Sequence, residues 1–288
     1  MRSWAAILTL MLAATAAPMA TPAASEGRDR WEKSYPIARR ATLRLRTDDG
    51  DVRLHTWDRH AITARVSTVG WRIGEGDVRI VERQVGDAVE LDVRTPRFEF
   101  HFGLLVRALH IDVWVPSEAD LNVESGDGDI SVPAVAGRLS VFSGDGRIEM
   151  DGARGALTLR SGDGRIVATG LDGTLEAATV DGGMHIEGRF DGLTLSSGDG
   201  AITAEVRSGS RLATPWSMRT GDGGLTLRVA SDLRAELDAH TGDGSIDIGM
   251  PVTLSGPAGR HGVRGALNGG GPTLTLRSGD GSIRVEGW

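Results

Sequence analysis

Apolar and polar residues alternate along most of this 288-residue chain, and Gly-Asp-Gly corners interrupt the alternation at intervals. The repeated unit is apolar-x-apolar-x-[Ser/Thr]-x-Asp-Gly-x-apolar-x-apolar. One copy consists of Leu139, Val141, Ser143, Asp145, Ile148 and Met150. Because side chains along a strand alternate between two faces, each side of the corner predicts one strand with one buried face. No segment from residue 117 onward keeps a 3.6-residue apolar period, so we expect strands rather than helices there.

The corners recur with a fixed spacing. Ser-Gly-Asp-Gly begins at Ser125, Ser143, Ser161, Ser197 and Ser278, Thr-Gly-Asp-Gly begins at Thr220 and Thr241, and looser copies begin at Thr47 and Thr179. The starts from 125 to 197 are 18 residues apart, and such a period is typical of a solenoid. Coils stacked about 4.8 Å apart would pair each strand with its equivalent, and crossovers between parallel strands favour one hand. The pattern predicts an all-β, single-stranded, right-handed parallel β-helix with coils of about 18 residues.

The regularity of the unit divides the chain into four segments. We expect a signal peptide over 1–24, a linker over 25–35, irregular N-terminal coils over 36–116 and the regular repeat over 117–288. The step from Thr241 to Ser278 is about two units long. For the glycine-rich segment 251–272, a degenerate coil and a loop that leaves the stack remain open.

The first residues have the pattern of a cleaved secretory signal. Arg2 is followed by an apolar stretch from Ala5 to Ala17 and then by Ala/Thr/Pro-rich sequence, and that stretch is too short for a membrane span. No later apolar run is long enough to cross a bilayer. We therefore expect export to the periplasm, the cell surface or the medium.

Composition excludes several kinds of chemistry. The chain has no cysteine, so disulfides and thiolate metal sites are absent. Lys33 is the only lysine and no glycine precedes it, which excludes a phosphate-binding P-loop. A net charge of −7 makes nucleic acid a poor partner. We expect no cofactor.

Two stretches resemble a known family. "VRLHTWD" (52–58) and "VPSEADLNVESGDG" (115–128), together with the repeated "L-x-L-x-S-G-D-G-x-I", are similar to the bacterial putative-adhesin domain family. The resemblance runs from about Trp31 to Trp288. It implies a toastrack-like right-handed β-helix in the cell envelope, and it brings no assigned activity and no catalytic residues.

The first hypothesis for the repeated corner is structural. Glycines on both sides of the aspartate would take positive φ, and the aspartate would accept hydrogen bonds from backbone N–H groups. Arg46, Arg160, Arg219 and Arg277 precede the Ser/Thr and would offset the stacked carboxylates. The predicted turn glycines are Gly126, Gly128, Gly144, Gly146, Gly162, Gly164, Gly198, Gly200, Gly221, Gly223, Gly242, Gly244, Gly279 and Gly281.

A calcium ladder is the sharper hypothesis, because stacked Asp-Gly turns offer carboxylates and carbonyls in a line. Its ligands would be Asp127, Asp145, Asp163, Asp181, Asp199, Asp222, Asp243 and Asp280. The opposite corner lacks a matching aspartate row, so the cage would be incomplete, and we assign no metal site.

A carbohydrate-active enzyme is the third hypothesis, because β-helix enzymes that hydrolyse or lyse polysaccharides use two or three carboxylates on one face. Adjacent Asp48 and Asp49 and the loop residue His261 are the candidates, but they form no constellation with distinct partners. The seven histidines are dispersed. The alternating Phe98, Phe100 and Phe102 favour a cap on the N-terminal end of the core over an exposed aromatic patch.

The sequence therefore predicts a non-enzymatic, adhesin-like envelope protein that presents a β-surface for binding or scaffolding, with no catalytic residues. The partner would be an unknown envelope protein or polysaccharide. The alternatives are a polysaccharide-active hydrolase or lyase with paired carboxylates, and a calcium-binding repeat protein.

Overall fold

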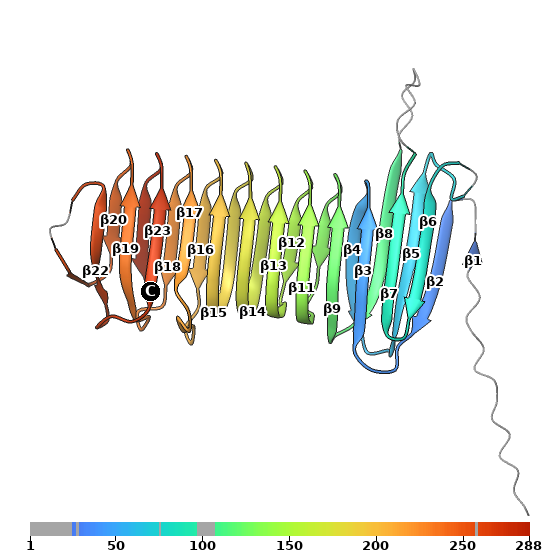
Figure 1. The fold of residues 1–288 in the computed structure, drawn as a ribbon, viewed down its shortest axis with the longest axis horizontal. Helices are drawn as coiled ribbons and strands as arrows, with labels where there is room; N and C mark the ends of the chain where they lie inside the picture. The colour runs from blue at the N-terminus through green and yellow to red at the C-terminus, as the bar shows by residue number, and fades with distance from the viewer. Residues whose placement is uncertain (1–24, 27–28, 75, 97–106, 257–258) are drawn as a thin grey trace, which may run out of the picture.

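The chain folds into a long stack of strands (Figure 1). The computed structural model describes residues 25–26, 29–74, 76–96, 107–256 and 259–288. Within these ranges the regular structure consists of 24 strands. None of the described residues forms a helix that could cross a membrane.

The regular repeat forms parallel coils, in which one coil is a strand, a corner and a second strand. Its strands are β9 (Ala119–Ser125), β10 (Ile130–Val132), β11 (Ala136–Ser143), β12 (Ile148–Asp151), β13 (Arg154–Ser161), β14 (Ile166–Thr179), β15 (Met184–Ser197), β16 (Ile202–Val206), β17 (Trp216–Thr220) and β18 (Leu225–Val229). Ser143 pairs with Ser125 on one side and with Ser161 on the other, so equivalent residues of successive coils lie side by side. Strands before the corner form one sheet, strands after it form the other, and β14 and β15 run through both.

The core lies between the two sheets as ladders of like residues. One ladder joins Leu121, Leu139, Leu157, Leu175 and Leu193, and the facing ladder joins Ile130, Ile148, Ile166, Met184 and Ile202. All of these side chains are buried. The alternation in the sequence therefore buries one apolar face of each strand, which is the main stabilising contribution of each coil.

Strand order at the C-terminal end departs from sequence order. The strands are β19 (Ala235–Thr241), β20 (Ile246–Gly249), β21 (Val252–Leu254), β22 (Gly262–Leu267), β23 (Thr273–Ser278) and β24 (Ile283–Gly287). β23 lies between β17 and β19, and β24 lies between β18 and β20. The last coil in the sequence is thus inserted before the preceding one (Figure 1).

The segment 251–272 is neither a further parallel coil nor an unpaired loop. β21 and β22 pair with each other in antiparallel fashion, and β22 adds antiparallel to the outer edge of β19. This pairing covers an edge of the sheet that would otherwise expose its backbone groups.

The N-terminal end is built in the same way. Its strands are β1 (Ser25–Glu26), β2 (Arg30–Pro36), β3 (Ala41–Thr47), β4 (Asp51–Trp57), β5 (Ala61–Val69), β6 (Arg79–Val85), β7 (Ala88–Arg94) and β8 (Ala108–Pro116). β3 and β4 pair with the regular coils, and β7 and β8 lie outside them as parallel neighbours. β5, β6, β2 and β1 are antiparallel. The expectation of β-helix coils throughout 36–116 is therefore corrected, and residues 30–36, which were mostly assigned to a linker, form a strand.

Polar side chains of β2 and β6 join the two sheets at this end. The Tyr35 hydroxyl on β2 donates to Glu82 Oε2 on β6 at 2.6 Å, and Lys33 also pairs with Glu82. Burial, together with the hydrogen bond to Glu82, raises the pKa of the Tyr35 phenol. Burial alone would raise the pKa of the Glu82 carboxyl, but the hydrogen bonds from Lys33 and Tyr35 outweigh it and hold that pKa below its usual value. The predicted signal peptide and the Phe98–Phe102 cap lie outside the described residues.

Candidate functional site

Along the regular repeat, the buried Ser or Thr hydroxyl of a corner joins one coil to the next. Ser143 Oγ accepts from the Gly146 N–H at 3.1 Å and donates to the carbonyl of Gly128, in the neighbouring coil, at 2.9 Å. Both contacts recur at Ser125, Thr179, Ser197, Thr220 and Thr241. The sequence pattern showed this position, but we assigned the corner hydrogen bond to the aspartate instead.

The corner glycines are needed for close approach and not for positive φ. None of the fourteen predicted turn glycines lies in the left-handed region; among the corner glycines only Gly50, in a looser copy, does, with φ of +103°. A Cβ on Gly146 would lie 2.1 Å from the Gly128 carbonyl oxygen, and one on Gly164 would lie 2.0 Å from that of Gly146. The expected role is corrected, because the constraint comes from the adjacent coil.

The aspartates form a solvent-exposed row along one edge of the stack. All eight of the proposed ladder residues are exposed, and the backbone N–H groups of seven of them, such as that of Asp163, donate to carbonyls of the adjacent coil. Within the described ranges, no group of three or more His, Asp or Glu side chains is arranged to hold a metal ion. The carboxylates therefore form a line of negative charge.

Three of the arginines beside the corners form ion pairs with carboxylates outside this row. Arg46 pairs with Glu124 at 2.9 Å and Arg160 with Glu176 at 2.7 Å, both carboxylates of strand residues. Arg277 likewise pairs with a strand carboxylate, Asp238, at 2.6 Å. The arginines were expected to offset the charge of the aspartate row, but the ion pairs of Arg46, Arg160 and Arg277 go to strand carboxylates instead.

The candidate catalytic residues do not meet. Asp49 Oδ1 accepts a hydrogen bond of 2.6 Å from the N–H of the next residue, Gly50, which is a contact within the turn. Asp48 lines an open hollow of about 620 Å³ beside Asp92 and Arg94. His261 lies next to β22, at the other end of the stack. No acid–base pair results from these three residues.

An aromatic group that the sequence pattern did not single out covers the outer face of β4, β8 and β5. The His55 ring stacks on the Trp114 ring with centroids 4.8 Å apart, and the Arg65 guanidinium lies over Trp114 at 4.8 Å. His55 Nε2 is 2.9 Å from Asp112 Oδ1. The Trp114 ring is thus engaged by protein groups from both neighbouring strands.

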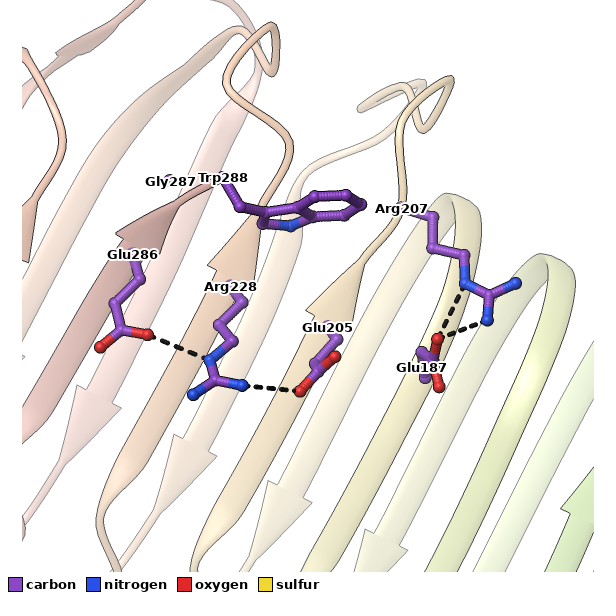
Figure 2. A pocket seen from close by; sticks show the side chains of 7 residues that line it. All are labelled: Glu187, Glu205, Arg207, Arg228, Glu286, Gly287 and Trp288. Atoms are coloured by element: carbon purple, nitrogen blue, oxygen red, sulfur yellow. Dashed lines mark hydrogen bonds and ion pairs between the residues drawn. The ribbon is translucent and has the colours of Figure 1, made fainter.

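A second aromatic lies open near the C-terminal end. Among the residues that the structure describes, Trp288 is the most exposed large hydrophobic residue, at 63%, and it borders a hollow of about 300 Å³. The charged residues below it come from four adjacent strands and their ends: Glu187, Glu205, Arg207, Arg228 and Glu286 (Figure 2). We call this group the Trp288 hollow.

Two sets of ion pairs form the floor of the Trp288 hollow. Arg228 lies between two carboxylates, with Nε 3.0 Å from Glu286 Oε2 and Nη1 3.0 Å from Glu205 Oε1. These hydrogen bonds raise the pKa of Arg228. Arg207 Nε donates to Glu187 Oε1 at 2.9 Å. The charged groups are therefore held in fixed positions beside the ring (Figure 2).

A family model described as Toastrack DUF4097 matches residues 42–286, which span the corner rows and the charged floor of the Trp288 hollow and end two residues before Trp288. The chain belongs to the Toastrack DUF4097 family. The resemblance predicted from the sequence motifs is confirmed, and the match begins in β3, the strand that pairs directly with the regular coils.

Solved structures similar to this Toastrack DUF4097 chain share little sequence with it. They include a putative cell adhesion protein from Clostridium sporogenes (12% identity, TM-score 0.30), a putative lipid binding protein from Parabacteroides distasonis (13%, 0.47) and a putative adhesin from Bacteroides fragilis (8%, 0.32). The matches cover 91%, 90% and 91% of this chain and 100%, 98% and 99% of those chains. No curated protein matches the chain significantly.

Proposed function

We propose that this chain is an exported, non-enzymatic protein of the cell envelope whose long sheets serve as a surface for binding or scaffolding. Its regular coils are taken to be right-handed, with about 18 residues each, as the crossover preference favours. The compartment would be the periplasm, the cell surface or the extracellular space.

One observation supports this proposal. Because the coils stack in parallel and in register, outward-facing side chains at equivalent positions of successive coils lie in straight rows. One such row consists of Asn122, Ser140, Thr158, Glu176, Thr194 and Ser217. Neighbouring members are about 4.8 Å apart, the spacing of adjacent strands. A rigid row of hydroxyl, amide and carboxylate groups suits an extended partner such as a polysaccharide or another envelope protein.

The rival function is polysaccharide cleavage. Its candidate carboxylates, Asp48 and Asp49, lie in a single turn, and Asp49 is engaged by the Gly50 N–H. General acid–base catalysis on a glycosidic bond needs two carboxyl groups that flank the bond. Consecutive residues on one turn do not flank an extended substrate.

Two measurements on the mature protein test the proposal. The first is capture of partners from an envelope extract on immobilised protein, with a variant that carries Thr158→Arg, Glu176→Arg and Thr194→Arg as the matched control. We expect specific partners on the unaltered surface and their loss from the variant, whose row is blocked by bulk and positive charge.

The second measurement is incubation with uronate-containing and neutral glycans. We expect no new reducing ends and no unsaturated products. If products form and are lost in Asp48→Asn or Asp49→Asn, the proposed scaffold function is wrong and the protein is an enzyme.

A further inference from the structure

The backbone of Trp288 is held in place by hydrogen bonds, although its side chain is exposed. The Trp288 backbone N–H donates to the Val229 carbonyl at 3.2 Å, and its carbonyl accepts from the Ser231 N–H at 3.1 Å. Cations lie over the rings of Trp57, Trp71 and Trp114. Within the described part of the chain, Trp288 has no such covering cation. Its ring is therefore free to stack on a ligand.

The floor of the hollow keeps unused hydrogen-bonding groups. Arg228 Nη2 and Arg207 Nη1 donate to no other group, and Glu205 Oε2 accepts from none, within the residues that the structure describes. Donors and acceptors thus alternate beside one aromatic face (Figure 2). An apolar ligand would leave these groups without water or partners, at a cost in free energy.

The charge of the hollow selects among polar ligands. Glu187, Glu205 and Glu286 carry three negative charges, and Arg207 and Arg228 carry two positive charges. The excess of one negative charge, within a chain of net charge −7, disfavours uronates and phosphates. Hydroxyl groups, which both donate and accept, match the mixed floor.

From these observations we propose that the Trp288 hollow binds a neutral sugar unit of a glycan. The apolar face of the sugar ring stacks on the indole of Trp288, and its hydroxyls bond to Arg228, Arg207 and Glu205. The hollow, at about 300 Å³, has the size of a small ligand site. This inference rests on the proposed function and adds a ligand class and a place to it.

Calorimetric titration of the mature protein tests the site. The probes are hexasaccharides of glucose, mannose and N-acetylglucosamine, with oligogalacturonate of the same length as the charged comparison. We expect at least one neutral hexasaccharide to bind and oligogalacturonate to bind at least tenfold more weakly. Trp288→Ala should weaken binding of the neutral sugar at least tenfold, whereas Trp288→Phe should weaken it less.

Two further variants separate the site from general surface effects. Arg228→Lys keeps the charge but cannot bridge Glu205 and Glu286, so we expect at least a threefold loss of affinity with the indole intact. Phe142→Ala removes another exposed ring, 45% accessible and remote from the hollow, and should leave the affinity unchanged. Melting curves of all variants verify that they fold.

The inference is overturned if none of the three neutral hexasaccharides binds, if Trp288→Ala binds as well as the unaltered protein, or if oligogalacturonate binds most tightly. These outcomes differ from failure of the proposed function. Trp288→Ala would still capture an envelope partner through its strand rows if only the sugar site were wrong.

Discussion

At the scale of single residues, the corner hydroxyls carry more of the structure than the corner aspartates. The corner hydroxyls are buried, and Ser143 and five others bond within their own coil and to the next, whereas the eight ladder carboxylates are exposed to solvent. Buried hydrogen-bonding groups are costly to leave unpaired, but exposed ones can bond to water. Substitutions at the two positions should therefore have different effects.

Ser143→Ala should lower the free energy of unfolding by about 1–3 kcal/mol, because the Gly146 N–H and the Gly128 carbonyl lose their partner. Ser143→Thr should cost less, since Thr179, Thr220 and Thr241 occupy the same position in other coils. Chemical denaturation of the three proteins measures both effects. If both substitutions lowered the free energy of unfolding equally, the hydroxyl group would not explain the stabilising effect of Ser143.

Gly223→Ala and Gly224→Ala form a matched pair of neighbours. A Cβ on Gly223 would lie 2.2 Å from the Gly200 carbonyl oxygen, but a Cβ on Gly224 would lie 3.5 Å from its nearest atom. We expect Gly223→Ala to lower the free energy of unfolding by about 1–3 kcal/mol, because the added methyl group overpacks the contact. Gly224→Ala should be within about 0.5 kcal/mol of the unaltered protein. If denaturant unfolding shows that both substitutions lower the free energy of unfolding equally, the close-approach explanation fails.

Asp163→Asn should change the free energy of unfolding by less than about 0.5 kcal/mol, because its exposed side chain lacks a protein partner within the described residues. Calcium at millimolar concentration should shift the melting temperature no more than magnesium does, since a weak site stabilises little. Calorimetry with both ions measures the shift. A large effect of calcium alone, lost stepwise as successive aspartates become asparagine, would restore the calcium ladder.

At the scale of elements, Asp238 connects three strands at the C-terminal end. Located on β19, it accepts from Arg277 on β23 at 2.6 Å and from Arg264 on β22 at 3.2 Å. The hydrogen bond from Arg277, followed by that from Arg264, holds the pKa of the Asp238 carboxyl below its usual value. The carboxylate thus helps to fix both neighbours of β19.

Asp238→Asn should destabilise the protein at pH 7 by up to about 1 kcal/mol, the range of partly exposed ion pairs. A carboxyl whose pKa is depressed by folding contributes its stability above its unfolded pKa and loses it as pH falls through the folded pKa. The deficit of the variant should therefore shrink below about pH 4. Denaturation at pH 7 and pH 3, with Asp163→Asn as the control, measures this; an unchanged deficit at pH 3 would contradict it.

At the scale of the whole molecule, the order of coils differs from the order of the sequence at both ends. β3 and β4 lie inside β7 and β8, and β23 and β24 lie inside β19 and β20. The outermost positions are then occupied by antiparallel strands, apart from β20 at one edge. Coverage of this kind keeps exposed edges from recruiting further chains.

Engineered disulfides can test this order directly, because the chain has no cysteine of its own. Arg219 pairs with Arg277, and Arg277 pairs with His240. Arg219→Cys with Arg277→Cys should therefore cross-link on oxidation, since directly paired residues of adjacent strands lie about 4.8 Å apart, within the Cα–Cα range of disulfides. Arg219→Cys with His240→Cys, which sequence order would make neighbours, should not. Non-reducing electrophoresis and mass spectrometry distinguish the two results, and the reverse outcome would refute the inserted coil.

The sequence determined what depends on short-range pattern. Alternation around Ser143, Ser161 and Ser197 specified the strands and their buried faces, and the 18-residue period specified the pairing of equivalent residues. These follow from the two-residue period of a strand and from the equal length of successive units. The family resemblance was carried by the same motifs.

Only the tertiary structure decided what depends on the neighbouring coil. The positive φ expected for Gly146 is replaced by contact with the Gly128 carbonyl, and the hydrogen bond expected of Asp145 is made by Ser143. The inserted coils and the Trp288 hollow combine strands distant in sequence, such as those of Glu187 and Glu286. A repeat pattern describes one unit, but the order in which units stack depends on how the ends of the stack are closed.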